Sequence, residues 1–307
     1  MQTCIHVLFA ILSPALCADW KLVWSDEFNG TKLDYSKWGI EQNAFGGGNQ
    51  EQQIYTDRSK NVRVENGSLI LEAHKDNAQI SGTQRPYSSG RIRTKHRGDW
   101  QYGKIEVRAK LPAGQGLWPA IWMLPTDEKY GTWAASGEID IMEFKGQEPA
   151  RIHGTLHHGG KWPDNRHTTK TLDLPQGNFT ESFHTFGVEW EQGKIHWTLD
   201  GKTWQTQTKW SSNGGSFPAP FDQRFHLLLN LAVGGQFVGA PTTQTSFPAS
   251  MEVDWVRIYQ DAEALLLGLV PEDSKIMRLA AGNDDLRPLI PVQISRLDVL
   301  HRRLLAT

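Results

Sequence analysis

The sequence predicts an all-β protein, a sandwich or barrel of many short strands. Short runs of alternating polar and apolar residues recur from Trp20 to Tyr259, with the period of half-buried strands. Gly and Pro punctuate these runs, as they do in the turns between strands. No long stretch of helical period occurs before residue 260. About 240 residues of short strands and tight turns are typical of one β-sandwich or barrel domain.

Four stretches of the chain support this prediction in turn. Residues 68–74 and residues 103–110 alternate between polar and apolar side chains. Residues 194–199 lead through an Asp-Gly pair into a further alternating run, and such a pair between two runs is a strong hairpin signal. Residues 251–259 close the series. Together these runs predict strands across the whole body of the chain.

The composition excludes several classes of protein. The 307 residues include 32 basic and 34 acidic side chains, which gives a formal net charge of −2. This near-neutral balance offers no electrostatic support for binding to nucleic acid or to an anionic membrane surface. The apolar fraction, counted with Gly and without Tyr, is about 45%, which is ordinary for a globular chain. Tryptophan is unusually frequent, since 13 Trp outnumber 12 Phe and 6 Tyr.

The first 18 residues have the pattern of a secretory signal peptide. An apolar run covers residues 5–16 and is followed by Cys17 and the small residue Ala18. The run is too short to cross a bilayer, but it suits the apolar part of a signal that is cleaved after Ala18. A buried N-terminal strand is the alternative. Both cysteines, Cys4 and Cys17, lie in this segment, so cleavage would leave a secreted protein without disulfides or thiols.

The chain changes character after residue 260. Residues 261–307 contain no Trp, Tyr or Phe, while Leu and Arg become frequent. Leu297, Leu300 and Leu304 fall at helical spacing. The tail carries no motif that indicates a role. We therefore expect one domain over residues 19–260, followed by a C-terminal tail of unknown role.

The most informative segment reads Ser-Gly-Glu-Ile-Asp-Ile-Met-Glu-Phe. Glu138 and Asp140 are two residues apart, so a regular strand places both side chains on one face. Glu143 is three residues further and would face the other way. A β-bulge at residues 141–142 adds one residue and returns Glu143 to the face of the other two acids. We therefore expect three carboxylates on one face, with Ile139 and one of the bulge residues in the core.

Three neighbouring carboxylates suit acid–base chemistry. Like charges raise one another's pKa, so one acid can stay protonated near neutral pH while another stays ionised. Glycoside hydrolysis needs such a pair, in which one carboxylate attacks the sugar or activates water and the other protonates the leaving oxygen. A solvated acidic face of an edge strand and a divalent metal site are the alternatives that the spacing leaves open.

Aromatic residues lie close to this segment in the sequence. Trp118 and Trp122 share a face if their segment is extended, and Trp133 follows shortly after. Sugars present apolar C–H faces that stack on indole rings. Core packing is the ordinary role of a single Trp. We expect core packing of four that sit in strand patterns: Trp24, Trp190, Trp197 and Trp255. The group near the acids instead indicates a carbohydrate-binding cleft.

Two further segments are candidates for the same cleft. The Gly-rich run that contains Asn49 is followed by neither a Lys-Ser/Thr pair nor a helix, so it does not predict a phosphate site. Contact between Asn49 and a substrate and a simple flexible turn are both open. His153 and His157 would form a zinc pair on a helix, but their context is extended and no third ligand is evident. A polar role in the cleft is therefore the favoured hypothesis for His157.

These residues together resemble a known family. The segment from Ser136 to Phe144 is similar to the active-site strand of glycoside hydrolase family 16. The extra residue before its second Glu resembles the laminarinase branch, the endo-β-1,3-glucanases. Supporting matches lie at residues 24–29, 87–92, 102–112, 153–157, 229–235 and 253–259. The resemblance covers about residues 20–260 and does not include the tail.

The resemblance implies a fold and a set of roles. The fold is a β-jelly-roll, a sandwich of two curved antiparallel sheets with the acids on the concave face. Glu138 is implied to be the nucleophile, Glu143 the general acid/base and Asp140 a supporting carboxylate. Six positions match the substrate-binding cleft: Trp118, Trp122, Trp133, Asn49, Arg91 and His157.

The resemblance also implies no cofactor for catalysis and a structural calcium ion on the convex side. Glu27, Gly67 and Asp254 match its ligand positions, where backbone carbonyls and one carboxylate suit a hard, oxygen-seeking cation. From the strand pattern alone, Asp254 could equally be an ordinary exposed residue.

The expected function is that of a secreted, monomeric, retaining endo-β-1,3-glucanase acting on a polysaccharide substrate, a β-glucan. A covalent glycosyl-enzyme would form on Glu138 and be hydrolysed by water that Glu143 activates. β-1,3-1,4-Glucanases and algal galactanases of the same family are alternatives, although the inserted Met142 argues against the shorter acid motif of strict mixed-linkage enzymes. A non-catalytic glucan-recognition protein is a further alternative, but such proteins lack the acids. We expect no nucleic-acid partner and no membrane association after signal cleavage.

Overall fold

The structure is a computed structural model that describes residues 18–266. The predicted signal peptide lies outside the described residues except for Ala18, and so does the tail beyond Leu266. The last described strand, β20 (Ala249–Asp261), and the helix α1 (Ala262–Leu266) extend slightly past the domain end predicted at residue 260. Within residues 18–266, no helix has the length and apolar character needed to span a membrane.

The larger of the two main sheets, called the outer sheet here, has ten strands. Besides β20 they are β1 (Trp20–Asp26), β3 (Gln53–Tyr55), β4 (Val62–Glu65), β5 (Ser68–Lys75), β8 (Tyr87–Ser89), β11 (Gly103–Lys110), β16 (His184–Glu191), β17 (Lys194–Leu199) and β18 (Lys202–Gln207). Their order is β18-β17-β16-β11-β20-β5-β8-β3, with β1 paired to β20 and β4 paired to β5. The pair of β3 and β8 is parallel, whereas the other pairs of this sheet are antiparallel.

The second sheet, called the inner sheet, has eight strands. They are β2 (Gly39–Ile40), β9 (Arg91–Arg93), β10 (Asp99–Trp100), β12 (Leu117–Pro125), β13 (Glu138–Phe144), β14 (Arg151–Gly159), β15 (Asn165–Asp173) and β19 (Phe225–Val233). Their order is β15-β14-β13-β12-β19-β9-β2, with β10 paired to β19. A small hairpin of β6 (Gln79–Ile80) and β7 (Thr83–Gln84) and the 3₁₀ turn η1 (Gly46–Gly48) complete the elements.

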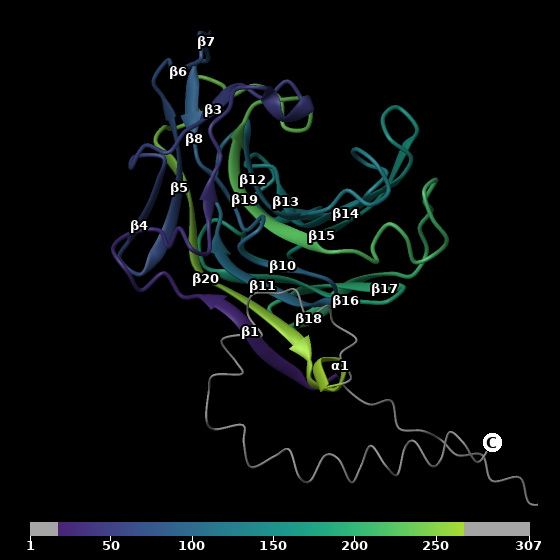
Figure 1. The fold of residues 1–307 in the computed structure, drawn as a ribbon. Helices are drawn as coiled ribbons and strands as arrows, with labels where there is room; N and C mark the ends of the chain where they lie inside the picture. Colours follow the sequence, from purple (N-terminus) through teal and green to yellow (C-terminus); the bar gives the residue numbers. More distant parts are fainter. Residues whose placement is uncertain (1–17, 267–307) are drawn as a thin grey trace, which may run out of the picture.

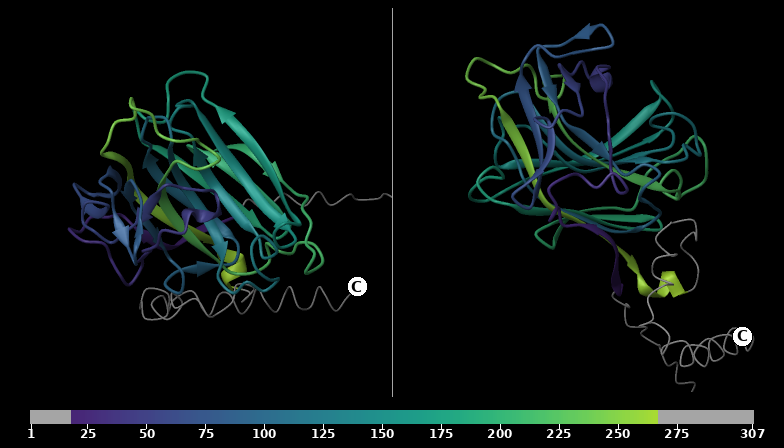
Figure 2. Two further views of the ribbon diagram at one scale, coloured as in Figure 1. Left: turned by 90° about the horizontal axis from the view of Figure 1, so that it is seen from above. Right: turned by 60° about the vertical axis from the view of Figure 1, so that its left-hand side comes forward.

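The two sheets lie one over the other, and the inner sheet is visibly curved (Figures 1 and 2). Its free face opens between η1 at one rim and the loops beyond β14 and β15 at the other (Figure 1). The prediction of an all-β sandwich of two curved, largely antiparallel sheets is confirmed. The curvature brings the rims of the free face toward each other above β13.

The core lies between the two sheets and is built by strand alternation. On β11, Ile105 and Val107 are fully buried among residues that pack from both sheets. Trp190 and Trp197 have no exposed surface, and Trp24 retains only 8%. The prediction that these three indoles pack the sandwich is confirmed.

The same prediction was wrong for Trp255, which is half-exposed on the outer face of β20. Val253 and Trp255 are two residues apart, so a regular strand would bury both. The register between β20 and β11 shifts by one residue at Asp254, and this bulge reverses the alternation. The guanidinium of Arg257 then lies 4.1 Å from the centroid of the Trp255 ring, on the outer surface.

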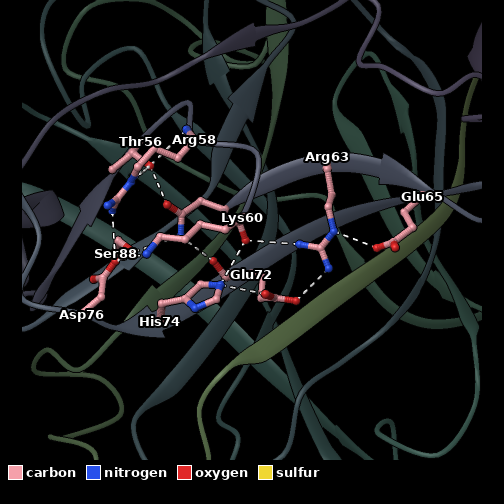
Figure 3. A network of polar contacts seen from close by, with 10 residues as sticks. Thr56, Arg58, Lys60, Arg63, Glu65, Glu72, His74, Asp76 and Ser88 are labelled. Carbon is pink, nitrogen blue, oxygen red and sulfur yellow. Dashed lines mark hydrogen bonds and ion pairs between the residues drawn. The ribbon is translucent and has the colours of Figure 1, made fainter.

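A polar network joins the loop before β4 to β5 and β8 (Figure 3). The Asp76 carboxylate accepts a hydrogen bond from the Ser88 hydroxyl at 2.9 Å and lies 2.6 Å from Lys60 Nζ. Nearby, Arg63 Nη2 lies 2.9 Å from a carboxylate oxygen of Glu72. These contacts fix the segment that follows β3 against the edge of the outer sheet.

Candidate active site

Strand β13 carries the three acids and contains the predicted bulge. Asp140 and Glu143 are three residues apart, whereas their partners on β14, Thr155 and His153, are only two apart. Residues 141–142 therefore share one position of the partner strand, which defines the bulge. The register with β12 shifts at the same place. The bulge thus returns Glu143 to the face that carries the other two acids, as the sequence predicts.

The core side of β13 differs in one detail from the prediction. Ile139 is fully buried, as expected. Ile141 and Met142 are 2% and 0% exposed, and both belong to the main core cluster. The expectation that only one bulge residue fills the core was wrong, because both side chains of the bulge turn toward the space between the sheets.

Two of the predicted tryptophans donate hydrogen bonds to the outer acids. The indole Nε1 of Trp133 donates to Glu138 Oε2 at 2.6 Å. The indole Nε1 of Trp118 donates to Glu143 Oε1 at 3.2 Å. Each outer carboxylate therefore has an indole that orients it. Trp133 is 40% exposed and offers its ring to a ligand, whereas Trp118 is buried, with Phe237 packed against it.

Burial and neighbouring charges raise the pKa of Asp140 and of Glu143. Burial raises the pKa of the Glu143 carboxyl well above its usual range, and the charges of Asp140 and Glu138 raise it further, against smaller lowering effects of His157 and Trp118. Burial also raises the pKa of Asp140, and the charge and hydrogen bonding of Glu138 add to this. Glu143 therefore keeps its proton at pH values where an exposed Glu is ionised, which suits a general acid.

His157 lies beside the acids, as the sequence predicts. It faces Glu138 across the strands, and its Nε2 lies 3.3 Å from Asp140 Oδ2 and 3.9 Å from Glu138 Oε1. Ligand atoms of these three residues lie within 4.8 Å of one another, so this geometry is also compatible with the divalent-metal alternative. His153 does not join such a group, because four residues along one strand separate two side chains by about 13 Å.

Trp122 and Arg91 form one stacked unit on the free face of the inner sheet. The Arg91 guanidinium lies 4.8 Å from the ring centroid of Trp122 and 4.9 Å from that of Tyr55. Only 6% of Arg91 is exposed, and its Nη1 lies 3.4 Å from Glu41 Oε2. The Trp122 indole donates to Asn230 Oδ1 at 2.8 Å. Arg91 therefore acts mainly by holding Trp122 in place.

Several residues of this surface were not singled out from the sequence. Asn230 interrupts the apolar run that fills β19 after His226, which is a signal that could have identified it. Phe237 lies 4.9 Å from the Trp118 ring and 5.2 Å from that of His153, so it closes the wall beside Glu143. The local sequence around Phe237 or Tyr55 does not predict that either belongs to the site, because their partners come from distant parts of the chain.

Asn49 lies at the rim, in the loop that contains η1. Its side-chain Nδ2 donates to Gly47 O at 3.3 Å, and its backbone oxygen accepts from Gln236 N at 2.8 Å. The side chain is thus turned toward its own loop. Asn49 shapes the rim in this structure, and its contact with a substrate stays a prediction.

The three predicted calcium positions meet at one edge of β20. Strand β1 ends opposite Val256 and β5 pairs up to Val253, so the residues just beyond them, Glu27 and Gly67, come to the same edge near Asp254. Backbone carbonyls of these turns together with a carboxylate would suit Ca²⁺.

The carboxylates at this edge already have partners. Glu27 binds Arg257 with both oxygens, at 3.0 and 2.8 Å, and Asp254 Oδ2 contacts Arg108. A bound cation would therefore depend mainly on the backbone carbonyls and the second oxygen of Asp254.

Comparison with known proteins agrees with this geometry. The family model described as glycosyl hydrolases family 16 matches residues 48–257. A glucan endo-1,3-beta-glucosidase A1 of Niallia circulans is 44% identical over 265 residues, which are 81% of this chain but only 39% of that protein. A glucan endo-1,3-beta-glucosidase of Cryptopygus antarcticus is 42% identical over 228 residues, covering 72% of this chain and 83% of that protein. The catalytic domain of an endo-1,3-beta-glucanase (laminarinase) from Thermotoga petrophila superposes with a TM-score of 0.71 at 35% identity, over 80% of this chain and all of that one.

Proposed function

The chain belongs to the glycosyl hydrolases of family 16, and on this premise we propose that it is a secreted, retaining endo-β-1,3-glucanase of the laminarinase type. The observation that carries the proposal is the bulged strand β13, which presents Glu138, Asp140 and Glu143 on one face. The similarity to two proteins named glucan endo-1,3-beta-glucosidases supports the β-1,3 linkage.

The reaction follows from the different surroundings of the two glutamates. The carboxylate of Glu138 attacks the anomeric carbon while protonated Glu143 gives its proton to the leaving glycosidic oxygen, so the sugar–oxygen bond breaks and a glycosyl ester forms. Glu143, now ionised, then takes a proton from water, which attacks the anomeric carbon and releases Glu138. Asp140 is buried between the two glutamates along β13, and its charge helps to raise the pKa of Glu143.

The alternative functions are family members with a different polysaccharide substrate and a glucan-recognition protein without catalytic activity. The bulge at residues 141–142 argues against the shorter acid motif of strict mixed-linkage enzymes, but it does not separate β-1,3-glucanases from algal galactanases. A glucan-recognition protein needs no acids, whereas here each outer acid is held by an indole donor. A divalent-metal site at the three carboxylates is disfavoured, because membership of the family gives these acids a role in glycoside hydrolysis that needs no cofactor.

Release of reducing sugar from laminarin, lichenan, curdlan and agarose tests the proposal. We expect the highest kcat/KM on laminarin, products of several lengths at early times, and a loss of at least about 10⁴-fold in the Glu138→Gln variant. No activity of the wild type on any of the four polysaccharides, or full activity of Glu138→Gln, would contradict the hydrolase function. Preference for agarose would favour the galactanase.

We also propose that the mature protein begins after Ala18, is a monomer and carries a structural Ca²⁺ at the edge of β20 near Asp254. The apolar run over residues 5–16 supports secretion, and the convergence of two turns on one edge supports the ion. N-terminal sequencing of the exported protein and light scattering test the first two statements.

A further inference from the structure

The loop that carries Trp133 is held by a second loop, and a buried glutamine joins the two. Residues 126–137, called the Trp133 loop here, connect β12 to β13, and residues 208–224, called the clamp loop, connect β18 to β19. Gln223 of the clamp loop is only 5% exposed. We propose that Gln223 is a positioning residue for the reaction, which holds the Trp133 indole where it orients the nucleophile Glu138. The inference deepens the proposed function and rests on it.

The side-chain amide of Gln223 binds three backbone groups. Its Nε2 donates to Ser136 O at 3.1 Å and to Pro220 O at 3.0 Å, and its Oε1 accepts from Lys129 N at 3.0 Å. Lys129 and Ser136 lie on either side of Trp133 in the sequence, so one amide fixes both ends of the turn that presents the indole. A side chain of the same length without an amide would leave these backbone groups without this partner, which is costly where they are buried.

The clamp loop is itself anchored to the core. Phe221 has no exposed surface, and its backbone oxygen accepts from the Trp190 indole on β16 at 3.1 Å. Gly137 packs so closely on the clamp loop that a Cβ atom there would lie 2.8 Å from the Phe221 ring. A further hydrogen bond joins the loops where Tyr130 Oη donates to the Asp222 carboxylate at 2.8 Å. The Trp133 loop is therefore fixed to a well-packed part of the sandwich.

The contacts between the loops lead to the nucleophile through one hydrogen bond. Trp133 is 40% exposed, so its ring is only partly held by packing. Its Nε1 donates to Glu138 Oε2 at 2.6 Å, and its backbone oxygen accepts from Trp162 N at 3.2 Å. A catalytic group that is displaced by about 1 Å can cost about 10²-fold in rate. A shift of the Trp133 loop would therefore lower kcat and change the affinity for a long polysaccharide much less.

Substitutions in the two loops test the proposal in the full-length protein. Gln223→Met keeps the length of the side chain but none of its hydrogen bonds, so we expect kcat on laminarin to fall by about 10- to 100-fold with KM within about threefold. Tyr130→Phe removes only the hydrogen bond to Asp222 and should lower kcat by about threefold. Gln207→Met is the matched control, because Gln207 is also buried, at 6%, and its amide donates to Thr168 O, which belongs to neither loop. Its kcat should stay within about twofold of wild type.

An aryl glycoside with a good leaving group separates the nucleophile from the acid. Hydrolysis of 2,4-dinitrophenyl β-laminaribioside needs attack by Glu138 but little proton donation by Glu143, and the initial burst of dinitrophenolate reports formation of the glycosyl ester. Gln223→Met should lose as much burst rate on this substrate as it loses kcat on laminarin, whereas Glu143→Gln should recover most of its burst rate. Recovery of the burst rate in Gln223→Met would overturn the proposal.

A double-mutant cycle with Trp133→Phe shows whether Gln223 acts through the indole. Once the indole N–H is absent, Gln223→Met should lower kcat by less than about threefold further. Full multiplication of the two single losses, or an unchanged kcat in Gln223→Met, would overturn the role. The same cycle with Tyr130→Phe uses a partly exposed residue, so the test does not depend on the folding of Gln223→Met.

A signal that needs no substrate separates this role from the proposed function. The nitrogen–proton resonance of the Trp133 indole, identified by its loss in Trp133→Phe, should shift in Gln223→Met and stay in place in Gln207→Met. A resonance that does not move in Gln223→Met would contradict the positioning role in an active enzyme as well. Failure of the wild type to hydrolyse any of the polysaccharides would instead reject the proposed function, and the resonance would still report the position of the indole.

Discussion

At the scale of single residues, each acid of the site has a close indole or imidazole neighbour. Trp133 donates to Glu138 and Trp118 donates to Glu143, while Asp140 lies next to an imidazole. Burial raises the pKa of Glu143, and the indole donation acts in the opposite direction. The pH range of catalysis is therefore set by a balance that a single substitution can move.

The variant Trp118→Phe should shift the pH profile. Removing the indole N–H removes one influence that lowers the pKa of Glu143, so that pKa rises. Because Glu143 must be protonated to act as the acid, the basic limb of kcat/KM should move to higher pH. The expected loss at the optimum is about 10-fold, since part of the ring surface is kept. Initial rates on laminarin from pH 4 to 10 measure both effects.

Trp162→Phe is the matched control for this experiment. Trp162 is the most exposed of the large apolar side chains of the described chain, at 71%, and no hydrogen bond of its indole to an acid is present in that part of the molecule. Its substitution should leave the basic limb in place. A basic limb that is unchanged, or that moves to lower pH, in Trp118→Phe would contradict the role assigned to the indole.

At the scale of elements, the bulge in β13 compensates for an uneven spacing of the acids. Three residues separate Asp140 from Glu143, and the bulge lets both point to the free face. Without residue 142 the acids would alternate regularly, and the partners on β14 would stay the same. The bulge thus accommodates one extra residue in β13 relative to β14, and deletion of single residues of β13 can test this role.

Deletion of Met142 should leave measurable activity, whereas deletion of Ile139 should abolish it. The first deletion gives a regular strand with all three acids on one face. The second places Glu138 next to Asp140 in sequence, so that the nucleophile turns to the opposite face, with a loss of at least about 10⁴-fold. Both residues are fully buried, so both deletions remove one core side chain. Laminarin hydrolysis measures the activity of the two variants, and thermal unfolding shows whether each is folded. Equal inactivity in two folded variants would contradict this account of the bulge.

The polar network at β5 and β8 makes a separate prediction about stability. Burial raises the pKa of Asp76, but hydrogen bonds from Lys60 and Ser88 and the charges of Lys60 and Arg58 outweigh it, so the pKa is lowered. A carboxyl with a lowered folded pKa adds stability above its unfolded pKa of about 3.9 and loses it as the pH falls through the folded value. Asp76→Asn should therefore lower Tm at pH 7 by about 2–4 °C and by much less near pH 3.

Calorimetry at both pH values checks this prediction. Asp173→Asn provides the control, because the Asp173 side chain is 56% exposed and pairs with Arg151 at the surface. An exposed pair contributes little, so Tm should change by less than about 1 °C. An equal deficit of Asp76→Asn at pH 7 and pH 3 would rule out the network as its source.

At the scale of the whole molecule, local patterns predicted the strands, the bulge and the group of acids, because each depends on residues close in sequence. The choice of a sandwich over a barrel came from the family resemblance. The unit of Tyr55, Arg91, Trp122 and Asn230 could not be derived in this way. Arg91, Trp122 and Asn230 meet because β9, β12 and β19 are neighbours in the inner sheet, while Tyr55 comes from β3 of the outer sheet. The prediction that Trp255 packs in the core was wrong for a related reason. A bulge in β20, which no local signal marks, turns the Trp255 side chain to the outer surface.

The proposed calcium site also joins distant parts of the chain. It lies where β1, the first strand, and the turn before β5 meet the last strand, β20. An ion that binds only the folded chain stabilises it in proportion to its concentration, by about 2.7 kcal/mol at 100 times Kd. The acids lie on the other sheet, so the ion should act on stability and not on the chemical step.

We therefore expect Tm to rise by several °C between EDTA and 1 mM CaCl₂, while kcat at 25 °C stays constant. Asp254→Asn should abolish most of this difference, because it weakens the carboxylate donor. Glu27→Gln should keep it, because both oxygens of the Glu27 side chain already bind Arg257. The same Tm in EDTA and in calcium would remove the ion from this account and leave the pairing of β1 with β20 and the Arg257–Glu27 pair to join the first strand to the last.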